Sequence, residues 1–348
     1  KGEPPLAKIH DWVNLTCPKC GGPARREAET MDTFVDSAWY WARYIDPRNE
    51  QEPFSRAKAD RWLPIDVYVG GPEHAVLHLL YFRFWTMVMH ELGLCAMSEP
   101  AQKLVTQGIV KGRDGEKMSK SKGNVVSPRE IISDYGADTA RLFILFAGPA
   151  EKDMDWSDEQ VQGMHRFLGR VWRLVHGALP KLAGVNPGGP VDDLRRRTHK
   201  TILRVTQQLE RLQFNTAISS LMELSNACTD WQGEPASLRE GLEALVQQLA
   251  PFAPHMAEEL WRELGHNEDL VKLGWPEADP ALVVDDAYQI AVQVNGKLRG
   301  EVQVLATAGE AEIRETAARD PKVAGWLSGK TVKKVVVIPK RLVNFVVA

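Results

Sequence analysis

Hydrophobic and polar positions divide the chain into three stretches with different periods. In residues 1–150, short apolar runs alternate with helix-like segments. Ile65-Asp66-Val67-Tyr68-Val69 is typical of a buried strand that ends at Gly70-Gly71, and a helical pattern follows from Pro72 to Gly93. A second strand is predicted from Leu104 to Val110. Strands that alternate with helices predict a parallel sheet of the α/β type, and this stretch can build half of one.

The second stretch, residues 151–284, is predicted to be all helical. Its apolar positions recur at spacings of three and four residues, which indicates an antiparallel bundle. A capping box, Ser157-Asp158-Glu159-Gln160, opens the first helix. The predicted helices are 157–182, 194–212, 214–231 and 238–264, the last interrupted at Pro251 and Pro254.

From residue 285 to 348 the hydrophobic period changes to two. Tyr288–Val294 alternates cleanly, Asn295-Gly296 is a strong hairpin signal, and residues 297–305 return as the partner strand. One helix over 311–327 and strands over 331–338 and 342–347 complete a predicted small β-β-α-β-β unit.

Composition excludes several classes of protein. The 348 residues are 44% hydrophobic and 26% charged, as in ordinary globular chains, and four cysteines do not make a disulfide scaffold. No run of 18 apolar residues is present, so we expect no membrane span. The formal net charge of −3 is uneven, because residues 287–348 carry a net +5. A basic small domain of this kind suits a nucleic-acid partner.

The stretch Gly108–Asn124 holds the most informative cluster of cations. Asp114-Gly115 turns a short hairpin, and Lys117, Lys120 and Lys122 follow it, interleaved with serines. A mobile loop that presents ammonium groups and hydroxyls can neutralise a triphosphate and follow the leaving pyrophosphate. Taken alone, such a basic run is more often a solvated turn.

Two glycines separate the first predicted strand from its helix, and polar side chains follow them. Gly70 and Gly71 allow close approach of a ligand at the carboxyl end of the strand, where Glu73, His74 and His78 follow. The alternative is a helix start with two core histidines. Zinc binding by His74 and His78, which are four residues apart, is a further alternative. It is disfavoured, because the hydrolytic zinc motif needs a glutamate directly after the first histidine and Ala75 stands there.

Cys17-Pro18-Lys19-Cys20 is half of a zinc knuckle. A structural zinc site needs four ligands, and no second pair of cysteines follows at a suitable spacing. Zinc bound by Cys17, Cys20, His10 and one distant ligand is the less favoured alternative to a metal-free turn. We therefore predict no metal ligands in this chain.

Three segments together resemble one enzyme family. Lys117-Met118-Ser119-Lys120-Ser121 resembles the KMSKS signature of class I aminoacyl-tRNA synthetases, and the pattern at 70–81 is typical of the leucine enzyme. The aromatic segment Glu29–Trp41, which alone could be core, also matches. The resemblance continues through 136–142, 214–217, 251–255 and 292–297. Nearly all the chain is similar to the C-terminal portion of a bacterial-type leucyl-tRNA synthetase.

The resemblance implies a fold of the class α/β plus all-α plus α+β. Residues 1–150 would be the C-terminal half of a Rossmann-type catalytic domain with the KMSKS loop. Residues 151–284 would be an anticodon-binding-type helical bundle, and 285–348 a small α+β tRNA-binding domain. Two family features, a His-x-Gly-His turn and an editing domain, are missing from this chain.

The resemblance also implies roles for individual residues. Lys117 and Lys120 would be catalytic. Leucine would be bound by Phe34, Ser37, Tyr40, Tyr68 and His78. ATP would be bound by Gly70, Gly71, Glu73, His74, Lys117, Met118, Ser119, Lys120 and Ser121. The tRNA would be bound by Lys297, Arg299, Lys333, Lys334, Lys340 and Arg341.

The implied function is that of a cytoplasmic leucine–tRNA ligase, as a fragment or subunit. Its substrates would be leucine, ATP with Mg²⁺, and tRNA(Leu). Because the His-x-Gly-His half is missing, we expect this chain alone to be inactive unless a separate polypeptide supplies that half. The alternative is a tRNA-binding module without catalysis.

Overall fold

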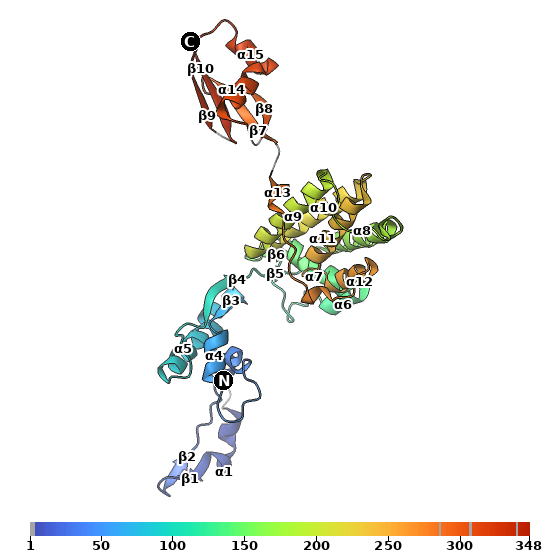
Figure 1. Ribbon diagram of the computed structural model, residues 1–348. Coiled ribbons are helices and arrows are strands. Elements are labelled where there is room, and N and C mark those ends of the chain that lie inside the picture. The colour runs from blue at the N-terminus through green and yellow to red at the C-terminus, as the bar shows by residue number, and fades with distance from the viewer. Residues whose placement is uncertain (1–3, 285–286, 306–307, 339) are drawn as a thin grey trace. The chain divides into compact units, whose positions relative to one another are not determined.

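The computed structural model describes residues 4–284, 287–305, 308–338 and 340–348 (Figure 1). The chain forms two compact units. The first contains the residues up to Val125 together with Ala150–Trp156, and the second contains Val126–Pro149 together with Ser157–Ala348. The expected boundaries at 150 and 284 stay predictions, and the second adjoins residues 285–286, which lie outside the described residues.

Parallel strand pairs organise the first unit. Strands β3 (Ile65–Gly70) and β4 (Ala101–Thr106) pair in parallel from Ile65↔Ala101 to Gly70↔Thr106, which confirms the parallel pairing expected from the sequence. A second parallel pair joins β5 (Val110–Lys111) and β6 (Met154–Asp155). The other elements are a 3-10 turn at Pro5–Lys8, α1 (His10–Val13), β1 (Asn14–Thr16), β2 (Pro23–Arg25), α2 (Phe34–Ser37), α3 (Tyr40–Arg43), α4 (Arg56–Trp62), a 3-10 turn at Pro72–Val76, and α5 (His78–Glu91).

Two predicted elements of this unit are wrong in detail. The helix does not run continuously from Pro72, because the backbone of Leu77 (φ −125°, ψ −103°) leaves the helical region between the 3-10 turn and α5. The predicted strand over 104–110 ends at Thr106. A Cβ atom at Gly108 would collide with the main chain of Lys152, so the chain passes close to another segment there instead of continuing the ladder.

The core of the first unit lies between α5 and the segments that pack on it. Its buried members are Trp41, Ala42, Phe54, Ala59, Phe82, Met89 and Cys95. The ring of Tyr68 on β3 stacks on Phe82 of α5 at a centroid distance of 4.5 Å. Strand β3 and helix α5 are therefore joined at the carboxyl end of the strand, close to the two glycines.

The second unit contains the predicted helical bundle. Its helices are α6 (Pro128–Tyr135), α7 (Ala137–Phe146), α8 (Asp158–Leu182), α9 (Asp193–Glu210), α10 (Phe214–Asp230), α11 (Pro235–Leu249), α12 (Pro254–Glu263) and α13 (Pro280–Val283), with a 3-10 turn at Leu270–Lys272. The Ser157 side chain caps α8 by accepting a hydrogen bond from the Gln160 N–H, and α11 and α12 are separated at the predicted prolines. Among the helices of the described residues, none is both long and apolar enough to cross a bilayer.

Residues far apart in the sequence join α7 to α12. The buried carboxylate of Asp138 accepts hydrogen bonds from His255 Nδ1 and from the Met256 N–H, both at 2.8 Å, at the start of α12. The guanidinium of Arg141 donates to the Pro251 carbonyl at 2.9 Å. The segments 136–142 and 251–255 are therefore held together by these side-chain hydrogen bonds around the start of α12.

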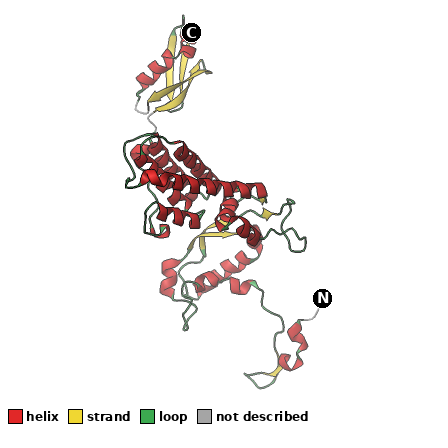
Figure 2. Cartoon of the chain, turned by 90° about the vertical axis from the view of Figure 1, so that its right-hand side faces the viewer, coloured by secondary structure: helices red, strands yellow, loops and turns green. Residues whose placement is uncertain are grey.

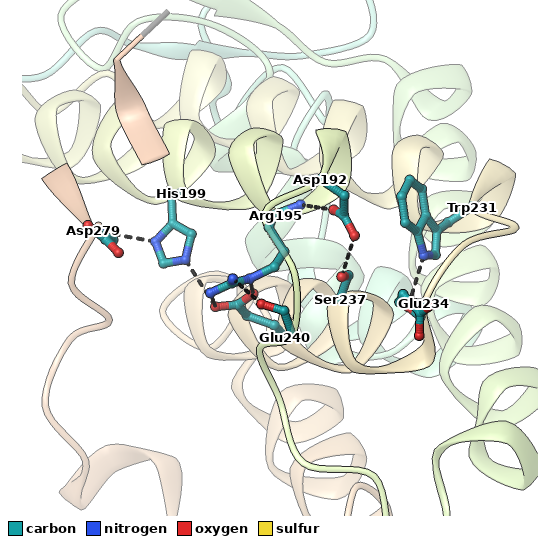
Figure 3. Close-up of polar contacts among 9 residues, drawn as sticks. Asp192, Arg195, His199, Trp231, Glu234, Ser237, Glu240 and Asp279 are labelled. Carbon is teal, nitrogen blue, oxygen red and sulfur yellow. Dashed lines mark hydrogen bonds and ion pairs between the residues drawn. The ribbon is translucent and has the colours of Figure 1, made fainter. Parts of the chain in front are cut away.

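A polar network also fastens α9 to α11 (Figure 3). The Asp279 N–H donates to His199 Nδ1, so the other ring nitrogen, Nε2, carries the proton that reaches Glu240 Oε1 at 3.0 Å. Arg195 Nε donates to the second oxygen of Glu240 at 2.6 Å. Burial alone would raise the pKa of Glu240, but the hydrogen bonds from His199 and Arg195 outweigh it and lower the pKa from 4.5 to about 2.

This network makes the free energy of unfolding of the bundle depend on pH. Because the folded state lowers the pKa of Glu240, the stabilisation is complete above pH 4.5 and disappears as the pH falls toward 2. We expect Glu240→Gln to reduce the free energy of unfolding at pH 7 by about 2 kcal/mol. The difference in stability between the variant and the parent protein should disappear as the pH falls toward 2. Urea titrations of both proteins across this pH range test it. Glu223→Gln, which disrupts an exposed pair with Arg204, is the control and should change little.

The C-terminal part of the second unit, from Ala287 onward, contains a four-stranded sheet and two helices among its described residues. Its elements are β7 (Ala287–Val294), β8 (Lys297–Leu305), α14 (Glu310–Arg319), α15 (Pro321–Leu327), β9 (Val332–Ile338) and β10 (Leu342–Val347), in the sheet order β8-β7-β10-β9. Both helices pack on one face of the sheet (Figures 1 and 2). Asn295 and Gly296 have positive φ values of 52° and 76°, which confirms the predicted hairpin turn.

The single helix predicted for this domain is wrong, because two helices occupy the segment. The Asp320 side chain accepts hydrogen bonds from the N–H groups of Lys322 and Val323 and so caps α15. Pro321 stands at the first position of α15 and has no N–H with which to continue α14. The unit is therefore β-β-α-α-β-β rather than β-β-α-β-β.

Candidate active site

A pocket of about 360 Å³ lies at the carboxyl end of β3, next to the start of α5. It is lined by Phe34, Ser37, Tyr40, Tyr68, Val69, Gly70, Gly71, His74, His78, Leu79 and Gln107. The five residues predicted for leucine are among them, as are three of those predicted for the adenosine. The structure thus brings together segments that are distant in the sequence.

Among the residues predicted to receive the adenosine, Glu73 does not line this pocket. Its carboxylate folds back against Gly71, at a place where a Cβ atom would collide with it. Gly71 therefore provides room for a neighbouring carboxylate as well as for a ligand. This is a second reason for glycine at this position.

The pocket is also lined by three residues that the sequence did not predict, Val69, Leu79 and Gln107. Gln107 directly follows β4, and its N–H donates to the Gly70 carbonyl at 3.0 Å. The carboxyl ends of neighbouring parallel strands meet at one edge of a sheet, so the pairing of β3 with β4 was the signal that could have found it.

A chain of hydrogen bonds crosses the pocket wall. The hydroxyls of Tyr40 and Tyr68 are 2.7 Å apart, and the Tyr68 hydroxyl is also 2.7 Å from His78 Nε2. Burial raises the pKa of Tyr68, and the bond with Tyr40 adds to the rise, so the phenol stays protonated. Burial, followed by the charge of nearby His74, lowers the pKa of His78. The pair Tyr68 and His78 is therefore polar but uncharged at neutral pH.

Aromatic rings surround these hydroxyls. The His78 ring, only 8% exposed, lies 6.5 Å from Phe34, 6.3 Å from Tyr40 and 5.4 Å from Phe82 between centroids. The Nδ1 atoms of His74 and His78 are buried and make no hydrogen bond within the described residues. A pocket lined by aromatic rings together with hydrogen-bonding groups is suited to a small molecule that carries both an aliphatic and a polar part.

The loop predicted to bind phosphates forms a separate feature of the same unit. Gly112 N–H donates to the Glu116 carbonyl at 2.8 Å, and Lys111 bridges to Lys117, which confirms the hairpin. Lys117 and Lys120 are exposed, and no ion pair engages either ammonium group within the described residues. None of the residues Lys117, Met118, Ser119, Lys120 and Ser121 lines the pocket.

The residues predicted to bind tRNA do not form one patch. Lys297 and Arg299 lie on β8, whereas Lys333 and Lys334 lie on β9, at the opposite edge of the sheet. Lys340 and Arg341 form the turn between β9 and β10. The guanidinium of Arg299 lies 3.5 Å from the centroid of the Trp326 ring, so this arginine is already engaged.

The Cys17–Cys20 segment forms the turn between β1 and β2. The Gly21 N–H donates to the Cys17 carbonyl at 2.9 Å, and both thiols are free. Within the described residues, no cluster of three or more His, Cys, Asp or Glu side chains could hold a metal ion. These two thiols do not fit a four-ligand zinc site.

Comparisons with known proteins place these features in context. A family model described as "tRNA synthetases class I (I, L, M and V)" matches residues 9–157, and one described as "Anticodon-binding domain of tRNA ligase" matches residues 192–313. The whole chain is 51% identical, over 360 residues, to the leucine–tRNA ligase of Geobacter sp. (strain M21), of which it covers 44%. It is 47% identical, over 391 residues, to that of Trichormus variabilis, of which it covers 45%.

Solved structures of two synthetases resemble the chain to different extents. The crystal structure of the Agrobacterium radiobacter K84 agnB2 LeuRS-tRNA-LeuAMS ternary complex matches all of it, with a TM-score of 0.89, 36% identity and 47% of that chain covered. The methionyl-tRNA synthetase of Mycobacterium tuberculosis matches 71% of this chain, with 53% of that chain covered, a TM-score of 0.50 and 19% identity, and so shares the fold. The chain spans less than half the length of the leucine–tRNA ligases it matches.

Proposed function

This chain belongs to the leucine–tRNA ligase family of class I aminoacyl-tRNA synthetases, and we propose that it forms part of an enzyme that makes leucyl-tRNA. The first unit would be half of a Rossmann-type catalytic domain. The bundle would be of the anticodon-binding type, and the last domain would bind tRNA. The chain would act in the cytoplasm with a polypeptide segment that supplies the rest of the catalytic domain.

One observation carries this proposal. Phe34, Ser37, Tyr40, Tyr68 and His78 come from α2, α3, β3 and α5, yet they line one pocket beside Gly70 and Gly71. In the proposed enzyme the aromatic part receives the leucine side chain. The glycines and His74 receive the adenosine of ATP.

The proposed reaction has two steps. The leucine carboxylate attacks the α-phosphorus of ATP in line, the bond to the bridging oxygen breaks, and pyrophosphate leaves together with the Mg²⁺ of the ATP complex. A hydroxyl of the terminal tRNA ribose then attacks the leucyl carbonyl, and AMP leaves. Lys117 and Lys120 would neutralise the charge that gathers on the leaving pyrophosphate, so the protein acts by positioning and electrostatics.

Pyrophosphate exchange tests the proposal. The chain is combined with a protein that carries the missing catalytic half, and leucine-dependent exchange of label between pyrophosphate and ATP is measured, with isoleucine as the control substrate. Exchange with leucine is the expected result. Binding of tRNA without any exchange would instead favour a non-catalytic tRNA-binding module.

The basic edge of the C-terminal domain supplies a second prediction. Lys333 and Lys334 are exposed neighbours on β9, an edge strand. We expect the double variant Lys333→Glu, Lys334→Glu to weaken tRNA binding. The slope of log affinity against log salt concentration should become shallower by an amount that corresponds to about two phosphate contacts. Filter binding of tRNA(Leu) between low and high salt measures both quantities. Lys322→Glu, outside the proposed surface, is the control, and an equal loss there would contradict the assignment.

A further inference from the structure

One side chain closes the loop that carries the proposed phosphate-binding lysines. Asn124 lies directly after the loop, and its Oδ1 accepts a hydrogen bond from the Ser119 N–H at 2.8 Å. Its Nδ2 donates to Asp114 Oδ2 at 3.0 Å and to the Lys117 carbonyl at 3.3 Å. One amide group therefore joins the segment before the loop, the loop itself and the segment after it.

Asp114, the anchor of this amide, is itself fixed in the hairpin. Its carboxylate accepts a hydrogen bond from the Glu116 N–H at 3.1 Å. That bond, and then the bond from Asn124, lower the pKa of Asp114, so the anchor is charged at neutral pH. A Cβ atom at Gly112 would lie 2.9 Å from both Asp114 Oδ1 and the Asn124 carbonyl, so glycine is needed for this close packing.

The lysines of the loop divide into two kinds. Lys122 Nζ lies 3.6 Å from Glu116 Oε2 and so belongs to the hairpin. Lys117 and Lys120 contribute main-chain carbonyls to the loop, while their exposed ammonium groups have no ion pair within the described residues. The amide of Asn124 thus holds the backbone that carries these two lysines and leaves their charges available.

We propose that Asn124 is a positioning residue for Lys117 and Lys120, which fixes the loop backbone so that both ammonium groups meet the phosphates of ATP together. This inference rests on the proposed function. A loop that is already ordered loses less entropy when it closes on the transition state, so the contribution belongs to the rate of adenylate formation and not to leucine binding.

Exchange kinetics test the positioning role. With the missing catalytic half supplied, Asn124→Ala should lower kcat for leucine-dependent pyrophosphate exchange about tenfold and leave the leucine KM within twofold. Asn124→Asp should be at least as impaired, because two carboxylates then face each other. The double variant Asp114→Asn, Asn124→Asp reverses donor and acceptor between these two side chains, but it does not restore the hydrogen bond to the Lys117 carbonyl, so it should recover only part of the lost rate. A double variant no better than Asn124→Asp would overturn the proposal, as would equal losses in kcat and leucine affinity.

Limited proteolysis of the chain by itself separates this inference from the proposed function. Trypsin cleaves after lysine, and cleavage after Lys117, Lys120 and Lys122 is followed by mass spectrometry. Asn124→Ala should accelerate cleavage at these three sites several-fold, because local opening becomes easier, with no change at other lysines. Asn186→Ala, at an exposed loop asparagine, is the matched control. Unchanged cleavage in Asn124→Ala would overturn the inference, whether or not the enzyme exchanges pyrophosphate.

Discussion

Replacement of Lys120 by alanine should lower the rate of leucine-dependent pyrophosphate exchange by about 100-fold to 1,000-fold, with the leucine KM nearly unchanged. The ammonium group of Lys120 is exposed and no ion pair engages it within the described residues, so it is available to the phosphates. In the proposed function, its charge would be needed most when negative charge develops on the leaving pyrophosphate. With the missing catalytic half supplied, exchange rates over a range of leucine concentrations at saturating ATP separate the two parameters.

Lys122→Ala is the matched control for this prediction. Lys122 belongs to the same loop, but its ammonium group pairs with Glu116 at 3.6 Å. We expect its loss to lower the rate less than about fivefold, as for an exposed ion pair. If the Lys120 and Lys122 variants lost activity equally, general positive charge would explain the loop, and the specific role of Lys120 would be abandoned.

Replacement of Tyr68 by phenylalanine should raise the leucine KM about 10-fold to 100-fold. The variant retains the ring that stacks on Phe82 at 4.5 Å and removes only the hydroxyl that joins Tyr40 to His78. His78 Nε2 then has no partner in a ring that is 8% exposed, and leaving such a group unpaired costs about 1–3 kcal/mol. The imidazole loses its fixed orientation in the pocket wall. The leucine dependence of pyrophosphate exchange measures the effect.

Tyr44→Phe is the control for Tyr68→Phe. Tyr44 packs edge-on against Tyr40 at 5.5 Å, but it is 74% exposed and does not line the pocket. Its leucine KM should stay within twofold of the parent protein. A normal KM in Tyr68→Phe would show that the hydroxyl chain does not orient the pocket, and the assignment of leucine to this wall would fail.

Local patterns predicted most of the secondary structure. Hydrophobic periods separated the helical bundle from the β-rich end, and Ser157, Asn295 and Gly296 have the local conformations that their residue types favour. The wrong predictions of element ends lie where the chain packs against a distant segment or where a side chain caps a helix. The strand predicted over 104–110 ends at Thr106, because Gly108 packs on Lys152, and the helix predicted over 311–327 is divided by the Asp320 cap.

Prediction of the candidate site rested on resemblance as much as on pattern. The motif residues Gly70, Gly71, His74 and His78 are near neighbours in the sequence, and all line one pocket. Gln107 could not be recognised in the same way, because a lone glutamine after a strand carries no chemical signal until the strand pairing is known. The charge pattern likewise predicted a basic C-terminal domain but not its division between two sheet edges.

The sequence by itself determined the hydrophobic period of each element and the turn residues, because these depend on interactions between near neighbours. It also showed the glycines, aromatics and lysines in segments that resemble synthetase motifs. Only the tertiary structure decided that Tyr40, Tyr68 and His78 share one hydrogen-bonded wall, and that the amide of Asn124 closes the lysine loop on Asp114. Such bonds require donor and acceptor within about 3 Å, and folding alone creates that proximity for groups separated along the chain.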